Sequence, residues 1–240
     1  DFSAFVPALG NFPDVLSMEL DASGNSHGGE IHTFRLFDAN APERLSLTVS
    51  GAVSEKTDSA SLPTAVVRSL ELKATPDELL RRMPALPVGA KLRNTAATLG
   101  TIRLSATGSI EGNGAAEAEA RLTSKLAGAA SVKAQGRLDN KFNPWEARIE
   151  ATLGALEVGA LAGVRDLGPV TAAAEARLRR SPRHKIPAGE ASVAVSEITF
   201  RGRKLADISL AAVFDGNNEG SVTLESDNSA LQAKIDAAFS

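Results

Sequence analysis

The sequence predicts an all-β, mainly antiparallel protein whose sheet is apolar on one face and polar on the other. Short runs in which every second residue is apolar recur along almost the whole chain, most clearly at 16–22, 45–50 and 102–110. Side chains on a strand point alternately to opposite faces, so a period of two indicates half-buried strands. The apolar face must be shielded from water, and the function of the protein depends on what shields it.

The composition suggests that a second sheet is a poor cover. Aromatic residues make up 4 % of the chain, with no Tyr and a single Trp. Alanine occupies every inward position of the runs 116–120 and 172–176. The core of a β-sandwich is normally filled by large side chains from both sheets. Two facing walls of alanine would leave a wide apolar space, which needs another occupant.

The remaining strands follow from the same period. It predicts strands at 67–74, 115–122, 130–138, 145–153, 170–178, 190–200, 204–214, 221–226 and 230–239, and one around Ile31 and His32. Residues that tolerate positive φ, at 112–114, 139–140 and 215–218, mark hairpin turns, so the strands should form an antiparallel meander. In 190–200 the apolar parity slips, which predicts a β-bulge. Strands should cover more than half of the chain.

Three short helical inserts interrupt the strands, near 3–9, 75–83 and 157–164. In the clearest, Thr75 is a suitable N-cap, Pro76 fits the first helical position and Glu78 completes a capping box. Its apolar Leu79, Leu80 and Met83 should lie against the sheet, either across an opening of the apolar groove or as a cap on a sheet edge. The regular spacing of the inserts predicts an internal repeat. Residues 1–240 are thus expected to form one elongated β segment, a fragment of a longer repeat-built protein.

Composition and motifs exclude several classes of function. A net charge of −3 gives no case for nucleic-acid binding, and without Cys there are no disulfides or thiolate metal sites. No apolar run is long enough to cross a bilayer as a helix. No nucleophile elbow, phosphate loop or dinucleotide fingerprint is present. We therefore expect no enzyme, no cofactor and no nucleic-acid partner.

Two polar features contain residue types that can bind metal ions. His27, His32 and His184 lack metal-ligand spacing and are expected to be surface residues. The run 215–220 resembles the first half of a calcium loop, but Ser226 stands where the loop needs a bidentate carboxylate. A plain hairpin turn is the favoured interpretation, and no metal is expected.

One basic cluster surrounds Ser181 and Pro182. Its cations either meet anionic lipid head groups or only keep a strand edge and loop soluble, and the second interpretation is favoured. The candidates for head-group contact are Arg179, Arg180, Arg183 and Lys185.

Three runs carry a family resemblance. Arg44 to Gly51, the proline-bounded insert from Pro76 to Pro87, and Asp207 to Phe214 resemble repeats of the AsmA-like and TamB family of Gram-negative envelope proteins, especially those of the Bacteroidetes. The resemblance implies an elongated sheet curled into an open U-shaped trough with an apolar interior. It also implies a periplasmic location, an inner-membrane anchor on the full-length protein, and transfer of phospholipid to the outer membrane. Support of outer-membrane protein assembly with a TamA-like barrel would involve parts of the protein outside this chain.

Residues and resemblance together predict a lipid-transfer segment that carries phospholipid acyl chains along its apolar groove. The predicted lining consists of Leu104, Ala106, Leu122, Val132, Ala134, Ile149, Ala174, Val193, Leu210, Leu224 and Ile235. Arg103, Lys133, Glu150, Ser209 and Lys234 should face water. The alternative is a non-catalytic structural or adhesive β-repeat module at the cell surface, which would be self-filled and dry.

Overall fold

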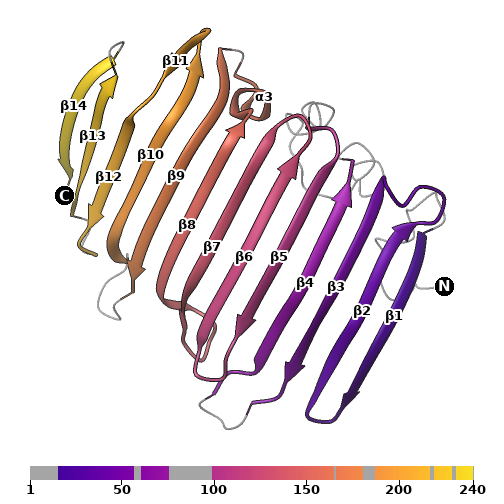
Figure 1. Cartoon of the computed structure of the whole chain (residues 1–240). Coiled ribbons are helices and arrows are strands. Elements are labelled where there is room, and N and C mark those ends of the chain that lie inside the picture. The colour runs from indigo at the N-terminus through magenta and orange to yellow at the C-terminus, as the bar shows by residue number, and fades with distance from the viewer. Residues whose placement is uncertain are drawn as a thin grey trace.

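A single antiparallel sheet contains every described strand of the chain (Figure 1). The structure is a computed structural model that describes residues 16–56, 61–75, 99–164, 166–180, 187–216, 219–228 and 231–239. The strands are β1 (Leu16–Asn25), β2 (Gly28–Asp38), β3 (Leu45–Ser54), β4 (Thr64–Ala74), β5 (Ile102–Ile110), β6 (Ala115–Ser124), β7 (Gly128–Leu138), β8 (Pro144–Leu156), β9 (Leu167–Arg179), β10 (Ala188–Phe200), β11 (Arg203–Leu205), β12 (Ile208–Phe214), β13 (Gly220–Asn228) and β14 (Leu231–Phe239).

Strand order follows chain order, so the sheet is a meander of successive hairpins. Only the short β11 leaves this path, and it pairs with β10. The indigo β1 and the yellow β14 lie at opposite edges of a twisted, curled sheet that is not closed into a barrel (Figure 1). The predicted antiparallel class and the open, elongated sheet are confirmed, and the strands cover more than half of the chain.

The local predictions agree with the structure in most details. The bulge predicted in 190–200 is present, as a register shift between Val195 and Glu197. The strand predicted at 204–214 is instead divided into β11 and β12, because Asp207 adopts a positive φ of 55° and turns the chain. A residue in the left-handed region departs from the extended conformation of a strand; Ala155 in β8, with a φ of 47°, instead lies at a register shift between Leu153 and Leu156.

Of the three predicted inserts, the structure describes one. The helix α3 (Val158–Ala162) lies within 157–164 and ends at Gly163, whose φ of 70° makes the left-handed C-cap that favours glycine. The inserts predicted at 3–9 and 75–83, with Leu79, Leu80 and Met83, lie outside the described residues except for Thr75.

In its described part, the molecule is one layer thick. Extensive contacts join only sheet neighbours, together with α3 and β9. The buried apolar residues of the described chain are few and lie at or beside strand ends: Leu45, Leu62, Ala74, Ala127 and Val170. The 24.9 kDa chain exposes 15338 Å², whereas a globular protein of this mass exposes about 10,000 Å². The apolar face is therefore not buried in a conventional core.

Two glycines allow neighbouring strands to approach closely at one end of the sheet. A Cβ on Gly136 would collide with the carbonyl oxygen of Glu146 on β8, and one on Gly189 with that of Arg177 on β9. Gly154, in contrast, has only ordinary contacts, with the nearest atom, the Cβ of Ala129, 3.9 Å from its ideal Cβ position. Glycine at 136 and 189 is thus a steric requirement of this packing.

The first prediction tests this close approach. Gly136→Ala should destabilise the fold by about 1–3 kcal/mol, because the added methyl group forces β7 and β8 apart. The matched variant Gly154→Ala should be neutral or stabilising by up to about 1 kcal/mol, since alanine loses less backbone entropy on folding. Chemical denaturation of both variants measures the difference, and equal stabilities would show that the strands do not approach as described.

Candidate functional site

Apolar residues form continuous rows across the sheet from β1 to β14. The central row pairs one apolar residue of each strand with one of the next, and β11 alone does not take part. It consists of Leu20, Phe34, Val49, Leu70, Ala106, Ala120, Val132, Ala151, Ala174, Val193, Leu210, Leu224 and Ile235. No polar residue interrupts it.

Two further rows flank the central one on the same face. The first runs from Met18 to Ile208 through Leu36, Leu47, Leu72, Leu104, Leu122, Ala130, Leu153, Ala172 and Val195. The second runs from Ala22 to Ala237 through Ile31, Gly51, Val67, Gly108, Ala118, Ala134, Ile149, Ala176, Ala191, Ala212 and Val222. We call the surface formed by these three rows the apolar face.

The register brings all eleven predicted lining residues onto the apolar face, as its rows show. The five residues predicted to face water take the alternate positions. Arg103 pairs with Thr123, Lys133 with Glu150, and Ser209 with Glu225, which pairs in turn with Lys234. Contact of the apolar face with lipid remains a prediction.

Bulges keep the rows intact where the sequence pattern slips. In β2 the step from Ile31 to Phe34 matches a two-residue step in β3, so one extra residue is absorbed. In β4 the step from Val67 to Leu70 is absorbed in the same way. A bulge changes the parity of a strand, and here it returns apolar side chains to the same face. The apolar positions of β2 were missed from the sequence for this reason; the three-residue step between its apolar residues was the available signal.

Several large apolar side chains on this face are open to solvent. Leu20 is 60 % exposed, Val132 44 % and Ile235 58 %. Apolar side chains exposed singly are ordinary, but a contiguous patch of them marks an interaction surface. Rows that cross a whole sheet make this face the strongest candidate site in the described chain.

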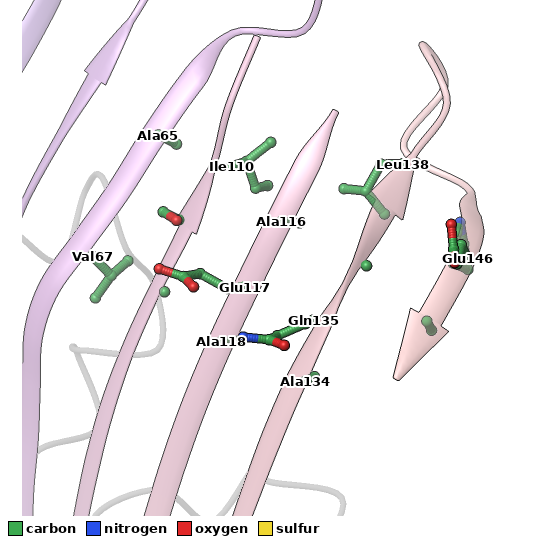
Figure 2. A pocket seen from close by; sticks show the side chains of 15 residues that line it. Ala65, Val67, Ile110, Ala116, Glu117, Ala118, Ala134, Gln135, Leu138 and Glu146 are labelled. Carbon is green, nitrogen blue, oxygen red and sulfur yellow. The ribbon is translucent and has the colours of Figure 1, made fainter. Parts of the chain in front are cut away.

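The apolar face is hollowed where its side chains are smallest. Strands β4 to β8 surround a hollow of about 400 Å³ whose exposed wall is mainly apolar, although Glu117, Gln135 and Glu146 also line it (Figure 2). Ala116, Ala118 and Ala134 form part of the wall, and the larger Ile110 and Leu138 stand at strand ends (Figure 2). Because the inward residues of β6 and β7 are mostly alanine rather than larger apolar residues, the hollow has room for an apolar ligand.

The opposite face is polar and carries a chain of ion pairs across three strands. Arg148 lies 2.8 Å from Glu150 and 3.0 Å from Glu175; Arg177 lies 3.0 Å from Glu175 and 3.4 Å from Glu190. These side chains are about half exposed, so each pair contributes under about 1 kcal/mol. Farther along, a hydrogen bond and the charge of Glu225 raise the pKa of Lys234. The charged, half-exposed side chains of this face are therefore compatible with contact with solvent.

The described polar candidates lie in exposed turns and on strand β2. His27 lies 3.3 Å from Glu55, and His32 bonds to Ser23 at 3.0 Å, with all four side chains exposed. Asp215 accepts a hydrogen bond from the Glu219 amide in the β12–β13 turn, as a hairpin requires. In the part of the chain that the structure describes, no cluster of three His, Cys, Asp or Glu residues could hold a metal ion.

The basic cluster is only partly described. Arg179 ends β9, and the Arg180 amide donates to the carbonyl oxygen of Trp145 at 2.8 Å. Arg183, Lys185 and His184 lie outside the described residues.

No protein-family model, curated protein or solved structure matches this chain. Among the described residues, no helix has the length and apolar character that a bilayer span requires.

The second prediction tests whether the hollow accepts an apolar guest. Ala118→Trp should weaken binding of a neutral apolar fluorophore several-fold, because the indole would occupy much of the hollow. The control Glu119→Trp places the same side chain on the polar face and should leave the affinity unchanged. Fluorescence titration gives both affinities, and thermal melting verifies the folds. Equal affinities for the two variants would place the fluorophore elsewhere.

Proposed function

We propose that this protein binds lipid acyl chains on its apolar face and lets them move along it. The central row from Leu20 to Ile235 carries the proposal, because it gives an unbroken apolar path from one sheet edge to the other. Each methylene group moved from water onto such a surface gains about 0.8 kcal/mol. A phospholipid tail therefore binds usefully without a single specific contact.

The apolar path is similar in composition along its length, which supports movement of an acyl chain along it rather than binding at one fixed place. The three rows consist of Ala, Val, Leu and Ile with two Gly, one Met and one Phe. They hold no charged side chain that would fix a lipid at one place. Similar contacts recur at each strand spacing of about 4.8 Å. An acyl chain can thus exchange one set of contacts for the next without leaving the apolar face.

The family resemblance of three sequence runs supports a location in the Gram-negative envelope for this activity. Their resemblance to AsmA-like and TamB proteins supports a role as a periplasmic segment of a bridge that transfers phospholipid between the inner and outer membranes. In that setting, the full-length protein would be anchored in the inner membrane. Assembly of outer-membrane proteins with a TamA-like partner would be a second use of the same bridge.

The direct experiment is to identify what copurifies with the protein. Native mass spectrometry and organic extraction of the purified chain should recover phospholipid in near-stoichiometric amounts. A self-filled structural or adhesive module would carry none, and a protein that remains lipid-free after incubation with phospholipid vesicles would contradict the proposal.

The third prediction separates an open groove from a packed core. Ala174→Arg places a charge on the central row and should abolish phospholipid binding, because acyl chains would meet a polar barrier. Its melting temperature should fall only modestly, since a guanidinium on an open face can still reach water. In a packed core the same buried charge would cost several kcal/mol and unfold a marginal domain.

Ala173→Arg is the matched control for this prediction. Ala173 is the preceding residue of β9, exposed on the polar face. This variant should bind phospholipid as the unaltered protein does. The smaller variant Ala134→Asp, made in the hollow, should behave as Ala174→Arg does. Loss of stability in step with loss of lipid would favour the self-filled module.

A further inference from the structure

One corner of the sheet combines exposed aromatic rings with cations. The β7–β8 turn lies at the lower edge in Figure 1, beside the end of β9. Phe142 in this turn is 50 % exposed, and Trp145 at the start of β8, the one Trp of the chain, is 40 % exposed. Lys141 in the same turn, and Arg179 and Arg180 at the adjoining end of β9, are also exposed. We call these five residues the aromatic–basic corner.

The turn holds its aromatic residue in a fixed, outward position. The Asp139 carboxylate accepts hydrogen bonds from the amides of Lys141 and Asn143 at 2.8 and 2.9 Å, and the Phe142 amide donates to the Asp139 carbonyl at 2.9 Å. The bonds from Asn143, helped by the nearby charge of Arg180, lower the pKa of Asp139, so its carboxylate is charged at neutral pH. Phe142 has a φ of 62°, which L residues rarely adopt. The turn thus holds a half-exposed ring in a backbone conformation that phenylalanine does not favour, and the ring lies beside the exposed Trp145 rather than singly.

The cations of the corner are available to an external partner. Among the described residues, no ion pair within 4.0 Å joins Lys141, Arg179 or Arg180 to an acid, although the charge of Arg180 acts on nearby Asp139. With Arg137 the area carries four cations, against the acids Asp139 and Glu146. The excess of positive charge complements an anionic surface.

A second corner at the opposite edge has the same residue types but different contacts. Phe200 is 41 % exposed there, yet the Arg201 guanidinium lies over its ring at 5.4 Å. Arg201 also pairs with Asp166 at 3.1 Å, and Lys204 with Glu197 at 2.9 Å. Because its ring and two of its cations are engaged within the protein, this second corner serves as an internal control.

The aromatic–basic corner also adjoins the hollow. Leu138 and Pro144, which bracket the turn, both line the hollow, as does Ala147 farther along β8. A surface that contacts this turn therefore lies next to the alanine-lined part of the apolar face. Aromatic rings flanked by cations suit the boundary between lipid tails and anionic head groups.

We propose that the aromatic–basic corner docks on a lipid bilayer that contains anionic phospholipid, with Phe142 and Trp145 at the head-group level. The bilayer would then meet the protein beside the hollow, where acyl chains can pass to the apolar face. The passage of chains depends on the function proposed above, but the docking itself does not.

The single Trp makes the experiment direct. On mixing with phosphatidylcholine–phosphatidylglycerol vesicles, Trp145 emission should shift to shorter wavelength and be quenched by lipids brominated near the head group, and the protein should cosediment. Vesicles of phosphatidylcholine alone should produce much weaker binding. No shift and no cosedimentation with the anionic vesicles would overturn the docking proposal.

Three variants identify the surface that binds. The double variant Arg179→Gln/Arg180→Gln should weaken vesicle binding at least ten-fold. Phe142→Gly should weaken it several-fold without loss of stability, because glycine prefers the positive φ at this position. Phe200→Ser, at the second corner, should bind vesicles normally. The assignment is contradicted if Phe142→Gly and Arg179→Gln/Arg180→Gln both bind vesicles as the unaltered protein does. It is also contradicted if Phe200→Ser loses vesicle binding to the same extent as those variants. Saturable capture by a soluble protein without vesicle binding would indicate a protein partner instead and would also contradict it.

One further variant separates this proposal from the proposed function. Ala174→Arg should still dock on anionic vesicles, although it no longer binds acyl chains. If the unaltered protein captures acyl chains but does not dock, the corner proposal fails and the proposed function stands. If it docks but does not capture acyl chains, the proposed function fails and the docking stands.

Discussion

The hydrogen-bond register between neighbouring strands is the constraint on which the apolar face depends. Side chains alternate between the two faces of a strand, so a slip of one residue at any hairpin would move every later apolar residue to the polar face. The register from Leu20 on β1 to Ile235 on β14 makes no such error. Where a strand carries an extra residue, as β2 does between Ile31 and Phe34, a bulge absorbs it. The apolar face is therefore a property of the whole meander.

A sheet of one layer has an unusual balance of forces. Its backbone groups are paired with neighbours, but its large apolar side chains gain only the burial that adjacent strands provide. The polar face adds little, since the ion pairs around Arg148 and Arg177 are half exposed. A β-sandwich is stabilised by burial of its apolar side chains against a second sheet. This single-layer sheet lacks much of that hydrophobic stabilisation. An apolar ligand on the face, such as an acyl chain, would supply it, and stability and function would then be linked.

The two proposed activities use different parts of one hairpin. The inward side chains of β7 and β8 line the hollow, whereas Phe142 in the turn between them and Trp145 at the start of β8 are exposed at the sheet edge. The Asp139 carboxylate fixes the turn through its bonds to the amides of Lys141 and Asn143. Docking and acyl-chain binding can therefore be altered separately, although a lipid that leaves a docked bilayer would meet both regions in turn.

The sequence alone determined the class of the fold, because alternation at 102–110 and in the alanine runs permits only half-buried strands. It also determined the face of residues such as Val132 and Ala174, since parity within a regular strand is unambiguous. A slip of the apolar period within a strand can signal a bulge, as it does in 190–200 and in the three-residue step of β2. Only the tertiary structure decided how the phases of separate strands combine, because that depends on the register between paired strands. The hollow and the aromatic–basic corner were likewise decided there, because both join residues of strands that only the register brings together.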